Sequence, residues 1–347
     1  MPVLSSIEPQ AALPGGHLTL LGTELGPGHT TPTVEINGVP ALVTLARPTR
    51  AIIRVPEGVL PGLVTLSVDG HSSNALPVAI AVPMAENLHP VANPAVDREG
   101  NVYATLSGSR GQQMPVSIFR IAPSPEGMTH ELRPLVREIL NPTGLAFGPD
   151  GLLYVSSRAE GTILRIDRTG LAMPYAEGLG IATGIAFDQQ GDLYVGDRSG
   201  TIFKIRAATS TRPQETFVFA TLEPSISAYH LAFDSRGTLY VTGPTTSSSQ
   251  SIHAIDRDGS ARIFYRGLGR AQGLAFNPAD AQDNLYVAAS LHGERGILRI
   301  TPAGEATLVV SGSNLVGLCF LPNGNVALAT RDAVYSVALN SSLASGR

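Results

Sequence analysis

A unit of roughly 40 to 50 residues recurs along most of this chain of 347 residues, and this internal repeat constrains the fold more than any other feature. Most copies hold a short apolar segment of the form Gly-(Leu/Ile)-Ala-Phe, then a turn, then a segment ending in Leu-Tyr-Val. Five copies align, beginning at Thr143, Thr183, His230, Gly273 and Gly317, and a diverged sixth copy begins at Pro94. A repeat of this length predicts similar units that bury their apolar faces against one another.

Each copy predicts a series of short β-strands. The first is apolar, the third alternates as in 162–167 and 296–300, and a variable fourth covers 215–222, 261–267 and 307–312. Four strands at this period are typical of a propeller blade, so the copies predict a six-bladed β-propeller over residues 89–340, followed by a tail at 341–347. The sixth copy lacks a clear fourth strand. We expect residues 82–88 to be a linker that can also supply this closing strand, and a three-stranded last blade is the alternative.

Residues 1–81 have a different character, with short alternating runs between turns that contain glycine or proline. The runs at 18–22, 33–36, 51–55 and 63–68 predict the closely spaced strands of a small β-sandwich. The composition also favours short strands joined by tight turns, because only 15% of the residues are charged and the chain holds 37 glycines and 26 prolines. Such a balance excludes a coiled coil and a charged disordered chain, and the whole protein is predicted to be all-β.

Residues 3–81 resemble the IPT/TIG family of immunoglobulin-like domains. The resemblance is carried by Ile7-Glu8-Pro9, the glycine-bounded run from Gly15 to Gly22, Val34-Glu35-Ile36-Asn37-Gly38 and Ser73-Asn74-Ala75. It implies an Ig-like β-sandwich that serves interaction rather than catalysis. Together with the repeat, it predicts an Ig-like sandwich followed by a six-bladed propeller.

The repeated Gly-(Leu/Ile)-Ala-Phe and Leu-Tyr-Val pattern of residues 89–339 resembles NHL-type and regucalcin/gluconolactonase-type propellers. Such propellers include lactonases, lyases and plain binding modules, so the resemblance predicts the fold better than the function. The gluconolactonase-type enzymes are expected to hold a divalent metal through Glu, Asn and Asp residues just before the innermost strands. The matching positions here are Ala92, Pro142 or Thr143, Thr183, Tyr229, Gln272 and Val316, and none is a carboxylate.

The resemblance therefore implies a neutral axial lining of Thr143, Thr183, Tyr229 and Gln272, with no metal site and no cofactor. Calcium and magnesium prefer hard, mostly anionic oxygen ligands, so a central Ca²⁺ or Mg²⁺ is the less favoured alternative.

The pair Tyr229-His230 departs from the repeat, because His230 stands where four other copies have glycine. One interpretation is catalytic, with His230 as a general base near neutral pH and Tyr229 beside it. The alternative is a structural histidine that donates a hydrogen bond to a neighbouring blade. Cys319, in a predicted inner strand, is interpreted as an inert buried thiol.

Arginine recurs in the loops that follow the second strands, and these loops are predicted to open on one face of the ring. The residues are Arg110, Arg158, Arg198, Arg295 and Arg331. Guanidinium groups gathered there would bind an anionic ligand through paired hydrogen bonds to carboxylate or phosphate. The alternative is that each arginine pairs with a local acid, namely Asp197, Glu160, Glu294 or Asp332.

The chain favours a non-catalytic binding or assembly module whose partner is a protein or a small anionic ligand. A lactonase-like hydrolase, or less so a lyase, acting at the propeller axis is the alternative. A net charge of −4 and the lack of tryptophan argue against a nucleic-acid partner. No apolar run is long enough for a membrane span, and the start of the chain has no signal-peptide pattern, so we expect a cytoplasmic protein unless a leader was removed.

Overall fold

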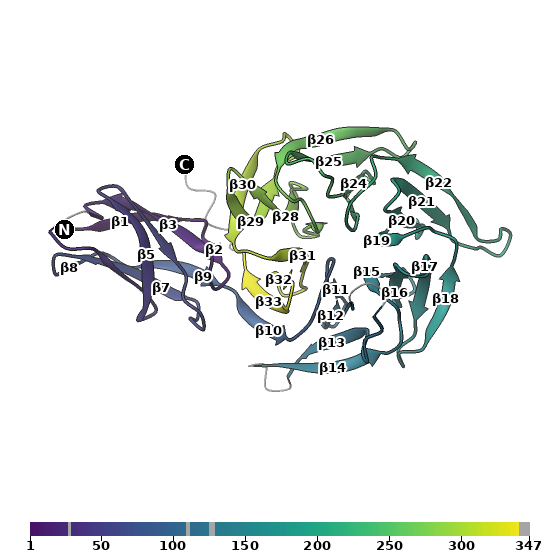
Figure 1. Cartoon of the computed structure of the whole chain (residues 1–347), viewed down its shortest axis with the longest axis horizontal. Coiled ribbons are helices and arrows are strands. Elements are labelled where there is room, and N and C mark those ends of the chain that lie inside the picture. The colour runs from purple at the N-terminus through teal and green to yellow at the C-terminus, as the bar shows by residue number, and fades with distance from the viewer. Residues whose placement is uncertain (27–28, 109–111, 125–128, 340–347) are drawn as a thin grey trace.

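The computed structural model describes residues 1–26, 29–108, 112–124 and 129–339, and every regular element in that part of the chain is a β-strand. An Ig-like domain lies beside a ring of blades (Figure 1). The predicted all-β fold, with an Ig-like domain followed by a propeller, is confirmed. No helix in the described residues is long and apolar enough to cross a membrane.

The Ig-like domain follows the strand order β1-β3-β6-β5-β4-β7-β9. Its strands are β1 (Val3–Glu8), β2 (Ala11–Ala12), β3 (His17–Thr23), β4 (Thr33–Ile36), β5 (Val39–Arg47), β6 (Arg50–Arg54), β7 (Gly62–Val68), β8 (His71–Ser72) and β9 (Leu76–Ile80). Alternate residues of β3 and β7 face inward, where Leu18, Leu20 and Leu66 pack with Ile36 and Ile53 in one core. Because successive side chains of a strand point to opposite faces, the apolar residues of each alternating run all face the core of the sandwich.

Within the described residues the propeller has six blades, each with four strands from residues 82–338. Blade one is β11 (Ala95–Val96), β12 (Val102–Thr105), β13 (Ile118–Pro123) and β14 (His130–Val136). Blade two is β15 (Pro142–Phe147), β16 (Leu153–Ser157), β17 (Thr162–Ile166) and β18 (Ala172–Ala176). Blade three is β19 (Ala182–Phe187), β20 (Leu193–Asp197), β21 (Thr201–Arg206) and β22 (Glu215–Thr221).

Blade four is β23 (His230–Phe233), β24 (Leu239–Thr242), β25 (Gln250–Ile255) and β26 (Ala261–Leu268). Blade five is β27 (Leu274–Phe276), β28 (Leu285–Leu291), β29 (Glu294–Ile300) and β30 (Ala306–Ser311). Blade six is β31 (Leu315–Phe320), β32 (Asn325–Thr330), β33 (Ala333–Ala338) and, from the N-terminal side of the ring, β10 (Val82–Glu86).

The outer strand of blade six is therefore supplied by the segment between the two domains. β10 pairs antiparallel with β33, from Val82 opposite Ser336 to Glu86 opposite Ala333. Met84 and Leu88 are buried in one apolar cluster with Val334. The two ends of the propeller segment thus meet within one blade, which closes the ring.

Repeated aromatic pairs explain the Phe and Tyr of the sequence repeat. The tyrosine of each second strand meets the phenylalanine of the next inner strand edge-to-face, with ring centroids 4.9 to 5.2 Å apart. The pairs are Tyr103–Phe147, Tyr154–Phe187, Tyr194–Phe233, Tyr240–Phe276 and Tyr286–Phe320. Ala327 and Val96 take these places where blade six meets blade one, and they pack in a single apolar cluster.

The Ig-like domain is joined to blade five by a shared sheet (Figure 1). β2 pairs in parallel with β30, with Ala11 opposite Val310 and Ala12 opposite Ser311. The Leu13 N–H donates to the Ser311 carbonyl at 2.8 Å, and the His17 N–H donates to Ser311 Oγ at 2.9 Å. β2 is therefore a fifth strand of blade five and covers its outer edge.

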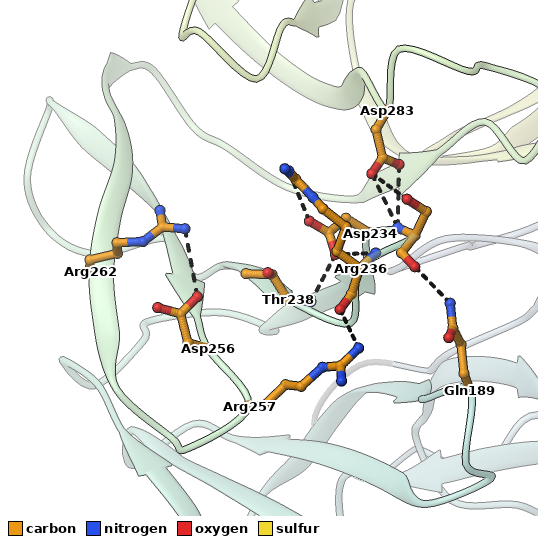
Figure 2. Close-up of polar contacts among 9 residues, drawn as sticks. Gln189, Asp234, Arg236, Thr238, Asp256, Arg257, Arg262 and Asp283 are labelled. Atoms are coloured by element: carbon orange, nitrogen blue, oxygen red, sulfur yellow. Dashed lines mark hydrogen bonds and ion pairs between the residues drawn. The ribbon is translucent and has the colours of Figure 1, made fainter.

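Hydrogen bonds between turns also link blades three, four and five (Figure 2). Asp234 accepts from the N–H groups of Arg236 and Thr238 at 3.0 and 2.8 Å and so closes the turn after β23. The neighbouring Ser235 donates from Oγ to Asp283 Oδ2 at 2.7 Å, and its carbonyl accepts from Gln189 at 2.9 Å. These turns all connect first to second strands, so they lie on one face of the ring.

Candidate functional site

The innermost strands of neighbouring blades approach one another closely at the glycines of the repeat. A Cβ on Gly144 would lie 2.4 Å from the Thr183 carbonyl oxygen, and one on Gly184 would lie 2.3 Å from that of Tyr229. Asn93 fills the corresponding place in blade one, where its amide donates to Leu274 O at 2.7 Å and accepts from the Leu318 N–H at 3.1 Å. The glycines therefore permit contact between blades, and Asn93 ties three inner strands together.

A cavity of about 300 Å³, which we call the axial cavity, extends from these glycines toward Phe233, Phe276 and Phe320. His230 lines it and is 3% exposed. Its imidazole has no hydrogen-bond partner among the described residues, so the alternative of a histidine bonded to a neighbouring blade is not what the structure shows. Burial lowers the pKa of His230 to about 4, which leaves a neutral ring at pH 7 and a weak base.

The four residues expected to line the axis lie elsewhere. Thr143 Oγ1 donates to Asn141 O at 3.2 Å, and Thr183 Oγ1 donates to Gly196 O at 2.8 Å. Gln272 lines a separate cleft. Side chains alternate along a strand, so when the glycine of the repeat faces the axis, the residue before it, such as Thr143 or Thr183, points between the blades. The prediction that these residues line the axis was therefore wrong. The axial cavity is lined instead by the Gly, Ala and Phe positions of the inner strands.

Tyr229 is also a structural residue. Its ring lies 2% exposed between blades three and four, against Gly196 and Gly243, where an added Cβ would come within 2.7 and 2.4 Å of it. Its hydroxyl donates to the Glu223 carbonyl, and burial raises its pKa to about 12. The arrangement holds blades three and four together and does not pair Tyr229 with His230 for catalysis. Cys319, expected to be buried, is half-buried and lines the axial cavity, where desolvation raises the pKa of its thiol to about 12.

The side chains near the axis offer few ligands for a metal ion. Within the described ranges, no three His, Cys, Asp or Glu side chains lie close enough together to hold an ion. The carbonyl oxygen of the Asn93 side chain, the nearest amide to the axis, already accepts from a backbone N–H. The donor set therefore does not fit a gluconolactonase-type metal site.

The face opposite the turns of Figure 2, which we call the rim face, carries the predicted arginines. Arg158, Arg198, Arg295 and Arg331 all lie in or beside loops that join second to third strands there, and Arg110 lies outside the described residues. In the described part of the chain none of these four forms an ion pair. The alternative of local acid partners is therefore wrong for these four.

The acids of these loops are engaged in other ways. Glu160 accepts from Ser157 Oγ at 2.9 Å, and Asp332 accepts from Thr330 Oγ1 at 2.9 Å. Asp197 accepts from the Ile181 N–H at 2.7 Å. On the turn face, Lys204 pairs with Asp192 at 3.0 Å, whereas Arg168 and Arg257 form no ion pair among the described residues. Arginines without an ion pair therefore occur on both faces.

The rim arginines form two groups rather than one. Arg158 is near enough to Arg198 that the charge of Arg198 adds to burial in lowering the pKa of Arg158. Arg198 donates to the carbonyl of Ile226 at 2.8 Å. Arg295 and Arg331 instead line a cleft of about 190 Å³ between blades five and six, which we call the rim cleft.

Sequence reasoning missed three polar residues of the rim cleft, Arg270, Ser290 and Asn314. Arg270 and Asn314 have left-handed backbones, with φ of 46° and 61°, in loops between blades. Both stand three residues before the glycine of the repeat, as Asn141 does in blade two, so this shared position is the sequence signal that could have located them. Gln272, predicted at the axis, is also here.

Comparison with known proteins agrees with the two-part fold. Residues 2–80 match the family model of the IPT/TIG domain. The N-terminal domain is an IPT/TIG domain. No curated protein matches the chain by sequence.

Solved structures resemble the whole chain or its propeller. An auxiliary nutrient binding protein from Bacteroides thetaiotaomicron is 13% identical, with a TM-score of 0.57 and 97% of each chain covered, so the match spans both the IPT/TIG domain and the propeller. A gluconolactonase from Xanthomonas campestris is 15% identical, with a TM-score of 0.57 over 76% of this chain and 90% of that one. A virginiamycin B lyase from Staphylococcus aureus is 18% identical, with a TM-score of 0.52 over 75% and 98%. At these identities the matches establish the fold.

Proposed function

We propose that this protein is a non-catalytic binding module that takes a small anionic ligand on the rim face of its propeller. The observation that carries the proposal is a group of arginines on this face that no carboxylate neutralises. Arg295 and Arg331 line the rim cleft, and neither forms an ion pair within the described residues. Unpaired guanidinium groups are available to carboxylate or phosphate, which they bind through two parallel hydrogen bonds.

Two further features support binding over catalysis. Its full-length structural relative from Bacteroides thetaiotaomicron is described as an auxiliary nutrient binding protein, which is consistent with a ligand-binding role for the shared architecture. The axial cavity, where a lactonase-like or lyase-like reaction would occur, offers a neutral His230 with no acidic partner among the described residues. His230 in that cavity is nevertheless the feature that favours the second candidate, a hydrolase acting at the axis.

The proposal is tested by two measurements on the same purified protein. Thermal unfolding is followed with citrate, inorganic phosphate or a neutral sugar at low salt, and lactone hydrolysis is followed with and without calcium, alongside the metal content of the protein. We expect the anions to raise the melting temperature, since ligands that bind only the folded state stabilise it. The effect should shrink toward physiological salt, because exposed charges are screened over about 8 Å there.

No lactone turnover and no bound metal are expected. Anions that leave the melting temperature unchanged would refute the binding module. Lactone hydrolysis that disappears in His230→Ala would establish the axial hydrolase instead.

A further inference from the structure

We infer that the rim cleft between blades five and six is the anion site, and that its ligand is a compact polyvalent anion carrying carboxylate or phosphate groups. This inference rests on the proposed binding function and names the place and the ligand class. Its residues come from three loops and the ends of neighbouring strands of the two blades. Those with polar side chains are Arg270, Gln272, Ser290, Arg295, Asn314 and Arg331.

The charge of the rim cleft is uncompensated. Three guanidinium groups line it, no acidic side chain does, and none of the three forms an ion pair within the described residues. Glu294 precedes Arg295 on β29 and so points to the opposite side of the strand. Asp332 follows Arg331, but its carboxylate accepts from Thr330. A ligand with at least two negative groups would complete the cleft.

Two side-chain amides beside the arginines are also free to bind. The side chains of Gln272 and Asn314 have no hydrogen-bond partner in the described part of the chain. An amide both donates and accepts, so these two suit hydroxyl or further oxyanion groups of the same ligand. The volume of about 190 Å³ limits the ligand to a small molecule and excludes a polymer from the cleft itself.

The loop that carries Arg270 is held in place before any ligand arrives. Gly269 and Ser290 exchange two backbone hydrogen bonds of 2.8 Å, and Ser290 Oγ donates to Gly269 O at 3.0 Å. Arg270 itself adopts a φ of 46°, which non-glycine residues rarely do and which is found disproportionately at binding sites. The backbone therefore fixes the direction of the Cα–Cβ bond of this arginine.

The IPT/TIG domain supports the other wall of the cleft. Gly312 lines the cleft and donates its N–H to Arg295 O at 3.0 Å. A Cβ at Gly312 would lie 2.9 Å from Leu13 of the N-terminal domain, and Leu13 is bonded to the adjacent Ser311. The N-terminal domain thus backs one wall of the cleft, although all the residues that line the cleft belong to the propeller.

The test uses two variants of the full chain that remove the same charge from the same face. Arg295→Gln with Arg331→Gln alters the rim cleft, and Arg158→Gln with Arg198→Gln is the matched control. Binding of citrate and of pyrophosphate is measured by calorimetry at low salt, and the fold of each variant is checked by thermal unfolding. We expect the cleft variant to lose at least about tenfold in affinity, since each lost arginine removes a charge-assisted contact. The control should lose less than about threefold.

The anion that binds identifies the ligand source. Citrate alone indicates a carboxylate, pyrophosphate alone a phosphate, and both an oxyanion site without preference. Replacing Arg295 and Arg331 by lysine should restore part of the binding, because charge returns without the planar fork. Equal losses in the two glutamine variants would overturn the rim cleft while leaving the binding function in place. Absence of binding to the unaltered protein would overturn both.

Discussion

Closure of the propeller by β10 predicts that one leucine between the domains stabilises the whole ring. Leu88 follows β10, is 5% exposed, and packs with Met84 and Val334 of blade six. Its backbone N–H donates to Asp332 O at 3.0 Å, so the side chain can be shortened without losing this bond. Leu88→Ala therefore tests apolar packing at the point where the chain closes its ring.

The expected cost follows from the burial of Leu88. Replacing a buried leucine by alanine costs about 2 to 5 kcal/mol, because the transfer free energy is lost and a cavity remains. Domain stabilities are about 5 to 15 kcal/mol, so the variant should lose a large part of the free energy of unfolding. For a domain of this size the melting temperature should fall by roughly 5 to 15 °C.

The assay is urea unfolding of the full chain followed by circular dichroism, with Leu171→Ala as the matched control. Leu171 lies beside the outer strand of blade two and is 58% exposed, so its replacement should cost within about 0.5 kcal/mol. Equal unfolding midpoints for the two variants would refute the conclusion that the segment after the first domain closes blade six.

Three other predictions concern the domain junction, the axis and pH. A chain beginning at Ala81 should have a lower melting temperature than the full chain, because β30 loses its pairing with β2. A chain beginning at His89 should melt at a still lower temperature, because blade six also loses β10. Equal melting temperatures of the two truncated chains would contradict the closure of blade six by β10. Gly184→Ala should destabilise the ring by about 1 to 3 kcal/mol in urea, since its Cβ would lie 2.3 Å from the Tyr229 carbonyl, and an unchanged midpoint would show that the inner strands can separate. The pKa of His230 is lowered from 6.5 to about 4, so the unfolded chain takes up this proton first and stability should fall by up to about 3 kcal/mol as pH drops from 6.5 to 4. His230→Gln should flatten that slope, and an identical slope in the variant would contradict the burial.

The repeat predicted the blades well because each blade uses the same contacts. Tyr154 and Phe187 recur as residue types, and they recur because every blade packs an aromatic pair against the next. The closing strand could be predicted for a similar reason, since the sequence of the sixth copy lacks a fourth strand and residues 82–88 were available to supply it. The pairing of β2 with blade five could not be predicted, because Ala11 and Ala12 form only a two-residue parallel pairing that has no sequence signature.

The candidate site was predicted only in part. Arg295 and Arg331 were placed on the correct face because they follow second strands in the repeat, and the structure brings both into the rim cleft. Thr183 and Tyr229 were misplaced, because alignment with a family fixes a position along a strand but not which way its side chain points. Arg270 was missed because arginine carries no sequence signature of a left-handed backbone, although it stands three residues before Gly273 of the repeat, as Asn141 stands before Gly144.

The most direct test of the rim cleft as an anion site is anomalous diffraction from crystals of the full chain soaked in tungstate, a compact divalent oxyanion. We expect the strongest anomalous peak within hydrogen-bonding reach of Arg270, Arg295 and Arg331 in the cleft between blades five and six. A strongest peak beside Arg158 and Arg198 or beside His230 in the axial cavity, or no peak at the rim cleft, would contradict it.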